Sequence, residues 1–319
     1  MSNILITGAG GFVGRALAAR LCGLQAAGQP AFDSLTLLDQ RLPPGPAAVG
    51  SVRRIEGDMQ DRDVLADALA TPPDLVYHLA GVTSRQAEAD VALSLGMNVG
   101  ASIALLELLR IQAQQATVVF ASSIGVFGTP LPPVIDDDTP QVPALSYGAQ
   151  KKMVEVLLAD YSRRAFVRGL SVRLPSVVAR PAQPGGALSA FASDLIRELA
   201  QGRPFTCPVP ADAAIWFLSV SACIDNLLHA AAVASAGQDL PATRALNLPA
   251  LRATPADIVD TLARRNGEGV RRRITYRPDA ALQAQFATWP PLFTPAADRL
   301  GFRHDGDLAS LLTRSLQSS

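Results

Sequence analysis

The sequence predicts an α/β protein built on a doubly wound parallel sheet with a smaller C-terminal lobe. Short apolar segments alternate with amphipathic helical segments through the first half of the chain, as in strands joined by right-handed crossover helices. A glycine-rich segment, residues 7–14, lies between the first strand and the first helix. We expect strands at residues 3–7, 34–38, 51–56, 75–79, 117–121 and 170–174.

The helical segments each show an apolar face. In the first, Val13, Leu17 and Leu21 recur four residues apart and therefore lie on one side of a helix. Beyond Pro175, further prolines divide the chain into shorter pieces. We expect residues 1–174 to form the sheet domain and residues 175–319 to form a smaller lobe, partly interleaved with the first. Further helices are expected at residues 98–114, after Tyr147, and at 188–200, 254–265 and 307–316.

The composition excludes several classes of protein. The 28 basic and 28 acidic side chains cancel, so no excess charge favours nucleic acid or an anionic membrane surface. No apolar run reaches the roughly 18 residues of a membrane span, and we expect no export signal before the first strand. Three scattered cysteines and three histidines show no metal-binding spacing. We therefore expect no metal site and a reducing, cytoplasmic location.

The glycine-rich segment, TGAGGFVG, has Gly8, Gly11 and Gly14 at the spacing of a dinucleotide-binding loop. Glycine at these positions permits a tight turn and close approach of a pyrophosphate. The N–H groups at the start of the helix, where Phe12 and Val13 lie, then face an anion. A flexible strand–helix turn is the alternative, but the strand before and the helix after favour dinucleotide binding. Residues 1–174 are therefore interpreted as a Rossmann domain.

Acidic residues follow the next two strands. Asp39 ends the second strand, where its carboxylate would accept hydrogen bonds from the adenosine ribose and repel a 2′-phosphate, which favours NAD over NADP. Arg41 nearby keeps NADP as an alternative. Asp58 and Met59 follow the third strand. Asp58 is a candidate contact for the adenine, with a helix N-cap as the alternative role.

Ser123, Tyr147 and Lys151 are candidate catalytic residues. Ser123 follows the fifth strand, and Tyr147 and Lys151 lie four residues apart on a helix, so their side chains share a face. A tyrosine ionises at neutral pH only if its phenolate is stabilised by roughly 4 kcal/mol, and a nearby ammonium and an oxidised nicotinamide have the required charge. The phenolate would take a hydroxyl proton while hydride leaves the same carbon, and Ser123 would hold that hydroxyl.

The chain has two lysines among its 28 basic residues, and they are neighbours, Lys151 and Lys152. We expect Lys151 to point into the site because a compact ammonium suits the role better than a planar guanidinium. Lys152 is about 100° further round the helix and is expected to face solvent.

These motifs resemble those of the extended short-chain dehydrogenase/reductase superfamily over essentially the whole chain. The likeness includes the run His78-Leu79-Ala80-Gly81 after the fourth strand and Asn98-Val99 in the next helix. It implies that Ser123, Tyr147 and Lys151 are catalytic and that Asn98 supports a proton relay behind Lys151. A homodimer through the two long helices after strands four and five is common in the superfamily and is expected here. The residues expected to bind NAD are Gly8, Gly11, Phe12, Val13, Gly14, Asp39, Asp58, Met59, Leu79, Ala80, Gly81, Asn98, Tyr147, Lys151 and Pro175.

Nucleotide-sugar epimerases and dehydratases are numerous in this superfamily and are the first alternative. The segment RLPSVVARP lacks their Tyr-Gly-Pro turn, and Phe127 replaces their usual Tyr. The segments YGAQKKMVEVLLADY, ALSAFASDLIREL and IWFLSVSACIDNLLHAA look like the D-erythronate dehydrogenase family. This resemblance implies NAD-dependent oxidation of a four-carbon sugar acid at C2 to the 2-oxo acid. A non-catalytic dinucleotide sensor is the second alternative, although such proteins often lose the Tyr or Lys that this chain keeps.

An acid substrate requires a cationic receptor, for which a bidentate arginine is best suited. Arg180 is the candidate because it follows the sixth strand at the edge where such sheets bind ligands. A salt bridge between the lobes is the alternative for Arg180, and Arg173 and His78 are interpreted as structural. Loop capping is the alternative for Thr83 and Ser84, and simple burial for Trp216. The candidate substrate contacts are Thr83, Ser84, Ser123, Tyr147, Ser176, Arg180 and Trp216, with Ser219 beside Trp216.

Overall fold

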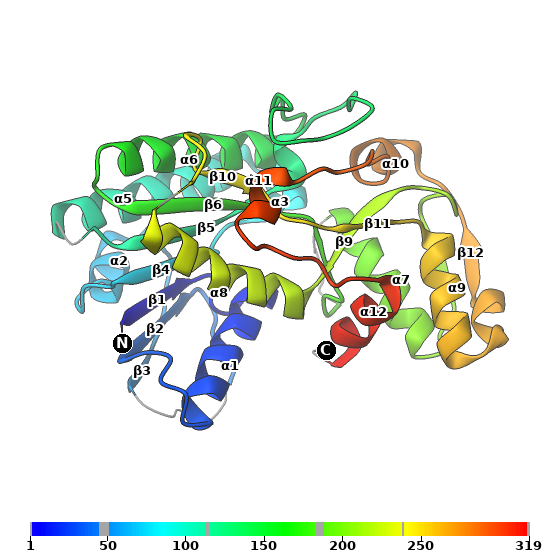
Figure 1. Cartoon of the computed structure of the whole chain (residues 1–319), viewed down its shortest axis with the longest axis horizontal. Helices are drawn as coiled ribbons and strands as arrows, with labels where there is room; N and C mark the ends of the chain where they lie inside the picture. Colours follow the sequence, from blue (N-terminus) through cyan, green and yellow to red (C-terminus); the bar gives the residue numbers. More distant parts are fainter. Residues whose placement is uncertain (1, 45–50, 113–114, 183–187, 238, 318–319) are drawn as a thin grey trace.

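The computed structural model describes residues 2–44, 51–112, 115–182, 188–237 and 239–317. Its centre is a seven-stranded sheet in the order β10-β6-β5-β4-β1-β2-β3, in which every neighbouring pair is parallel (Figure 1). The doubly wound α/β fold expected from the sequence is confirmed, and the six predicted strands agree to within two residues at each end. The strands are β1 (Asn3–Thr7), β2 (Ser34–Asp39), β3 (Ser51–Glu56), β4 (Leu75–His78), β5 (Thr117–Ser123), β6 (Arg168–Leu174) and β10 (Ala245–Asn247).

Helices bury both faces of this sheet. Successive residues of a strand point to opposite faces, so Ile4 and Ile6 of β1 pack with one helical layer and Leu5 packs with the other. The first layer consists of α1 and α8, and the second of α2, α5 and α6. The bounds of these helices are α1 (Phe12–Ala26), α8 (Val220–Ala236), α2 (Arg62–Ala68), α5 (Ala101–Gln112) and α6 (Ser146–Arg163).

The helix that ends in α5 starts earlier than expected. α4 (Val91–Leu95) continues through one π-helical segment, Gly96–Gly100, into α5, whereas the sequence predicted a start at residue 98. By length and mean hydropathy, 1.7, residues 91–112 form a helix that is long and apolar enough to cross a membrane. Leu105 and Leu109 of this helix are buried against the central sheet, as in the core helix of a globular domain.

The C-terminal lobe has a separate apolar core. Helices α7, α9 and α12 contribute to it together with a three-stranded sheet, β11-β9-β7, and a two-stranded sheet, β12-β8 (Figure 1). The elements of this lobe are β7 (Ser176–Val178), the 3₁₀ turn Leu188–Ala190, α7 (Phe191–Ala200), β8 (Phe205–Cys207), β9 (Ile215–Ser219), β11 (Leu251–Ala253), α9 (Pro255–Asn266), the 3₁₀ helix Glu268–Arg273, β12 (Ile274–Tyr276), α10 (Ala280–Phe286) and α12 (Leu308–Gln317).

Three elements from beyond residue 175 belong to the central layers. α8 covers the main sheet, and β10 pairs with β6 at its edge. α11 (Pro295–Arg299) and Phe302 pack in the same core as α1 and α8. The division into residues 1–174 and 175–319 stays a prediction, and α8, β10 and α11 are the elements that interleave the two parts.

The loop between β1 and α1 is closely packed against backbone. Gly8 has a φ of +74°, in the left-handed region that favours glycine, and a Cβ there would lie 2.6 Å from the Ala80 nitrogen. A Cβ on Gly14 would lie 2.1 Å from the Gly8 oxygen. Because these neighbours are backbone atoms, neither position can hold a larger residue without moving the loop.

We expect Gly14→Ala to displace the loop and to lower the affinity for a dinucleotide at least about tenfold, a loss of about 1.4 kcal/mol. Gly23, in the same helix, is the matched control because nothing lies within 4 Å of a Cβ built there. Gly23→Ala should leave affinity unchanged and raise stability by up to about 1 kcal/mol through helix propensity. Calorimetric titration with NAD and thermal unfolding measure both effects. Equal affinity in the two variants would refute this account of the loop.

Candidate active site

A cavity of about 510 Å³ lies at the carboxyl edge of the central sheet, where it meets the C-terminal lobe. The strand order reverses between β1 and β4, and parallel sheets bind ligands outside such a reversal. One part of the wall consists of the glycine loop, Asp39 and the segments after β4 and β6, and another of the ends of β5 and α6. The C-terminal lobe contributes Ser189, Ser193, Gln285, Phe286 and Trp289.

The glycine-loop part of the cavity fits a dinucleotide. α1 begins after Gly11 with no side-chain cap and no acidic residue in its first turn, so its N-terminal N–H groups and positive dipole end remain for an anion. Of the fifteen residues expected to bind NAD, eleven line the cavity: Gly8, Gly11, Phe12, Val13, Gly14, Asp39, Leu79, Gly81, Tyr147, Lys151 and Pro175.

Asp39 is held at the mouth of this part of the cavity. One carboxylate oxygen accepts a hydrogen bond from the Gly10 backbone N–H at 2.9 Å, and the other accepts one from Arg41 N–H at 3.3 Å. The carboxylate is therefore fixed next to the loop that would carry the pyrophosphate. Arg41 also lines the cavity.

Asp58, Met59, Ala80 and Asn98 do not line the cavity. Asp58 accepts hydrogen bonds from the Gln60 backbone N–H and the Gln40 amide, and the N-cap of α2 is Asp61, so the alternative role of Asp58 as that cap is wrong. The side chain of Met59 is buried in the core. A contact of Asp58 or Met59 with the adenine stays a prediction.

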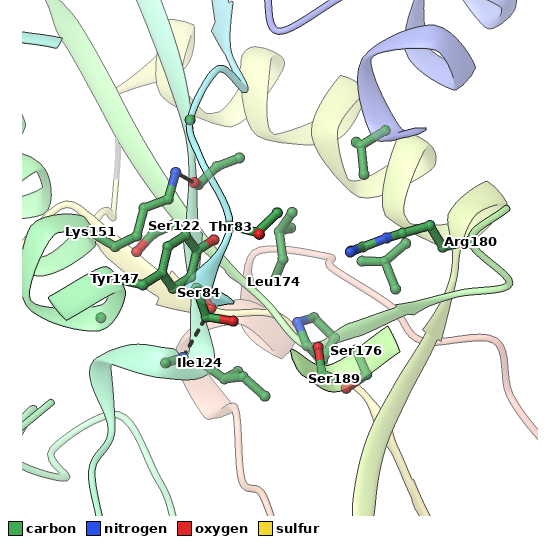
Figure 2. Close-up of a pocket in the computed structure, with 18 of the residues that line it drawn as sticks. Thr83, Ser84, Ser122, Ile124, Tyr147, Lys151, Leu174, Ser176, Arg180 and Ser189 are labelled. Carbon is green, nitrogen blue, oxygen red and sulfur yellow. Dashed lines mark hydrogen bonds between the residues drawn. The ribbon is translucent and has the colours of Figure 1, made fainter. Parts of the chain in front are cut away.

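The three candidate catalytic residues converge at the junction of β5 and α6. Ser123 ends β5, and its Oγ accepts a hydrogen bond from the Gly125 backbone N–H at 3.0 Å. The Tyr147 phenol lies near Ser123, whose side chain acts to lower the pKa of that phenol. Lys151 follows one helical turn later, and Figure 2 shows its side chain and that of Tyr147 extending from the same helix into the pocket.

The Lys151 ammonium is nearly completely buried. Its Nζ donates a hydrogen bond to the Ala121 carbonyl at 2.9 Å and lies 4.6 Å from the centre of the Phe120 ring. Burial lowers the pKa of Lys151 to about 8, while the Glu155 carboxylate acts in the opposite direction. Lys151 is therefore close to losing its proton at the upper end of the physiological pH range.

Arg180 is a cation that acts on Tyr147 in this structure. Burial raises the pKa of the Tyr147 phenol, whereas the positive charge of Arg180 and the side chain of Ser123 lower it. The expectation that Lys151, together with an oxidised nicotinamide, lowers the pKa of Tyr147 stays a prediction. The i, i+4 spacing brings the two side chains together, but the Lys151 Nζ lies over the Tyr147 ring, 5.7 Å from its centre.

One expectation about the surroundings of Lys151 needs correction. Lys152 does not simply face solvent: its Nζ donates to Gln141 Oε1 at 2.8 Å and lies 3.4 Å from Glu155 Oε2. Asn98 is in the π-helical segment, where its Nδ2 donates to Gln150 Oε1 at 2.7 Å. A Cβ built on Gly81 would lie 2.8 Å from Asn98 Oδ1 and 3.5 Å from Lys151 Nζ. Asn98 thus lies behind the site, and its part in a proton relay stays a prediction.

His78 has both ring nitrogens satisfied, as interpreted from the sequence. Nδ1 is 2.7 Å from the Thr7 hydroxyl, and Nε2 is 2.8 Å from the Ser102 hydroxyl. Because Ser102 donates its single proton to the Asn98 carbonyl, His78 must donate from Nε2 and accept at Nδ1. Burial, assisted by the charge of Lys151, lowers the pKa of His78 to about 3. His78 is therefore a neutral structural residue.

Arg180 enters the pocket from the side opposite Tyr147 (Figure 2). It follows β7, and burial lowers the pKa of its guanidinium. Within the described ranges, no carboxylate lies within ion-pairing distance of Arg180, and Asp194, the acid that acts on it, pairs with Arg197 at 2.6 Å. The alternative of a salt bridge between the lobes is therefore not found.

Hydroxyl groups line the cavity between Tyr147 and Arg180. Thr83 and Ser84 begin α3 (Ser84–Ala89), with Thr83 as its N-cap, so capping and cavity lining are both realised. Ser176 lines the cavity from β7, as predicted, and Ser189 and Ser193 were not anticipated. Their only sequence signal is a polar side of the predicted helix at 188–200.

The prediction that Trp216 walls the pocket is wrong. Trp216 is fully buried, its Nε1 donates to the Pro290 carbonyl at 2.8 Å, and its ring packs on Trp289, 4.6 Å between centroids. Trp289 lines the cavity instead. Ser219 caps α8, accepting from Ala222 N–H at 3.0 Å, and likewise does not wall the pocket.

Comparisons with known proteins agree with this geometry. The model of the NAD dependent epimerase/dehydratase family matches residues 4–240. The chain is 41% identical to D-erythronate dehydrogenase of Cupriavidus necator, covering 99% of this chain and 98% of that protein. It is 32% identical to D-erythronate dehydrogenase of Haemophilus influenzae, covering 99% of each. A crystal structure named as the nucleoside-diphosphate-sugar epimerase from Agrobacterium tumefaciens superposes with a TM-score of 0.90 at 31% identity, covering 100% of this chain and 95% of that one.

One assignment is supported by these matches, by the glycine loop and by the arrangement of Ser123, Tyr147 and Lys151. The chain belongs to the NAD dependent epimerase/dehydratase family and is an NAD-dependent oxidoreductase of the short-chain dehydrogenase/reductase type.

Proposed function

We propose that this protein oxidises a small sugar acid at C2 with NAD, and that D-erythronate is its substrate, giving 2-oxo-tetronate. The two relatives named D-erythronate dehydrogenase cover nearly the full chain and support this substrate. The observation that carries the proposal is the position of Arg180, a cation inside the cavity that faces Tyr147 and pairs with no described carboxylate.

In the proposed reaction, Tyr147 is the base after it releases its resting proton to solvent, and the positive charge of Arg180 helps to stabilise the phenolate. The proton of the C2 hydroxyl passes to the Tyr147 oxygen, and the C2–O bond becomes a carbonyl as the C2–H bond breaks. Bound NAD supplies the acceptor for the hydride that leaves C2. The Ser123 hydroxyl forms a hydrogen bond with the oxygen on C2 and so holds C2 in position for the reaction. Lys151 lies on the side of the site where NAD would bind, and its ammonium keeps a positive charge near the Tyr147 phenolate.

Arg180 would receive the substrate carboxylate. A guanidinium binds a carboxylate through two parallel hydrogen bonds, which fixes the orientation of the adjacent C2. Thr83, Ser84 and Ser176 then supply partners for the remaining hydroxyls of a short polyol acid. Trp289 and Phe286 contribute the apolar wall, the part that the sequence had assigned to Trp216.

An epimerase acting on nucleotide sugars is the second candidate because the Agrobacterium structure carries that name at 31% identity. Such an enzyme returns its hydride to the substrate and forms no net NADH. A dinucleotide sensor is the third, but the retained arrangement of Ser123, Tyr147 and Lys151 argues against it.

We further propose a homodimer formed through the helix at residues 91–112 and α6. Large apolar side chains are exposed on both, including Ile103, Ile111, Met153 and Val156. Apolar patches of this kind on neighbouring helices mark protein–protein contacts. We also retain the cytoplasm as the proposed location, since the three cysteines are free and buried, as suits a reducing compartment.

With NAD and D-erythronate, the wild-type protein should produce NADH, measured as absorbance at constant enzyme concentration. Tyr147→Phe should lower kcat by at least about 100-fold because the proton acceptor is lost, while NAD affinity, which depends on many other residues as well, falls much less. A panel of four- to six-carbon sugar acids and a nucleotide sugar completes the test. Absence of NADH with every acid would reject the dehydrogenase proposal, and turnover of the nucleotide sugar without NADH would favour the epimerase.

Replacing Arg180 by Met should raise the KM for the acid roughly 10- to 100-fold, because a charge-assisted hydrogen-bonded pair with the carboxylate is lost. It should also shift the rising limb of the pH–rate profile to higher pH, because the charge that lowers the pKa of Tyr147 is gone. The KM for NAD is the internal control. A preference for the acid over its neutral amide that survives in Arg180→Met would place the carboxylate elsewhere.

The homodimer predicts that Val156→Glu halves the mass measured by light scattering, because a buried carboxylate without a partner opposes association. Val142→Glu is the matched control: Val142 is 69% exposed against 58% for Val156, but it lies in a loop. A dimer that persists in Val156→Glu, or a wild-type monomer, contradicts the proposed interface.

A further inference from the structure

A buried ion pair lies directly behind the candidate catalytic residues. Glu155 on α6 and Arg173 on β6 are 1% and 3% exposed. Arg173 Nε donates to Glu155 Oε1 at 2.9 Å and its NH2 group donates to Oε2 at 2.8 Å, a bidentate pairing. Arg173 also donates to Asn247 Oδ1 at 3.1 Å, which joins β6 to β10. The pair therefore has good geometry on both carboxylate oxygens.

Glu155 also holds the end of β5. The Ser122 hydroxyl donates to Glu155 Oε1 at 2.6 Å. Ser122 directly precedes Ser123, and the Ala121 carbonyl that accepts from Lys151 directly precedes Ser122. Since Glu155 lies one helical turn after Lys151, a single carboxylate connects the strand that carries Ser123 to the turn of α6 that carries Lys151.

Glu155 is the anion whose charge acts on Lys151. Among the described residues, Tyr147 and Glu155 on its own helix and His78 on β4 interact with Lys151. Arg173 on β6 and Lys152 on α6 bind the same Glu155 carboxylate. His78 is neutral, with a pKa of about 3, and Tyr147 is protonated at rest because burial raises its pKa. The Lys151 ammonium thus depends on Glu155 against the burial that lowers its pKa to about 8.

We propose that Glu155 is a positioning residue of this active site, which fixes the Ser123 strand end against the Lys151 turn and supplies the negative charge that keeps Lys151 an ammonium. Arg173 holds the Glu155 carboxylate in place through two hydrogen bonds. Lys152, which lies 3.4 Å from the same carboxylate with a partly exposed side chain, is a peripheral partner. The kinetic part of this inference rests on the proposed oxidation, but the charge of Lys151 is measurable without turnover.

The chain has two lysines, so the charge of Lys151 is accessible by NMR. In a Lys152→Arg background, lysine labelled with ¹³C at Cε gives one lysine resonance, whose shift follows the protonation of Lys151. The midpoint of its titration should lie near pH 8 in this background. Because Glu155 raises the pKa of Lys151, Glu155→Gln should move the midpoint to lower pH, by on the order of one pH unit.

Two further variants keep the test decisive if Glu155→Gln does not fold, since removing one partner leaves Arg173 buried without its counter-charge. Glu155→Gln/Arg173→Met removes both charges and should also lower the midpoint, by less than Glu155→Gln because the opposing Arg173 cation is removed too. Ser122→Ala keeps the ion pair, so its midpoint should stay near pH 8, while kcat falls about tenfold with little change in the KM for NAD.

Two results would overturn the inference: a midpoint unchanged in the double variant, or wild-type kcat in Ser122→Ala. These results are distinguishable from failure of the proposed oxidation. If the wild-type protein oxidises no sugar acid, the function is wrong, and the NMR titration still decides whether Glu155 maintains the charge of Lys151.

Discussion

Parallel pairing is the constraint on which the rest of this structure depends. Because β1, β2, β4, β5 and β6 run in one direction, their carboxyl ends meet at one edge. That edge places the glycine loop, Asp39, Gly81 and Ser123 around a single cavity although they are far apart in the sequence. The C-terminal lobe covers this edge and completes the wall of the cavity. The common direction of the strands thus determines where the candidate active site forms, and the individual side chains determine its chemistry.

The sheet and its glycine loop could be predicted because their signals are local. A run such as Asn3–Thr7 is apolar, β-rich and followed by glycines, and each of these features acts within a few residues. Tyr147 and Lys151 were found for the same reason, since helical spacing alone puts them on one face. Trp216 was misassigned because nothing local distinguishes it from Trp289. Which of two stacked rings reaches a cavity depends on how residues 285–291 return to the sheet, a long-range property.

Electrostatic roles were harder to predict than positions. Spacing brought Lys151 close to Tyr147, but the direction of its Nζ is set by the Ala121 carbonyl and the Phe120 ring, which belong to another strand. Arg180 acts on Tyr147 from the opposite wall, over a distance that no motif encodes. Glu155 and Arg173 read separately as a helix acid and a strand cation, and only the packing of α6 on β6 makes them a pair. Which charged groups interact at this site is therefore determined by tertiary packing.

The π-helical segment at Gly96–Gly100 has a consequence for the outer surface of its helix. An α-helix advances about 100° per residue, so Leu95 and Ile103, eight residues apart, would be out of phase by about 80° in a regular helix. A π turn takes up one additional residue, and the two side chains return to nearly the same azimuth. Both are exposed. The π-helical segment that carries Asn98 behind Lys151 thus also aligns two exposed apolar side chains on one face of the helix.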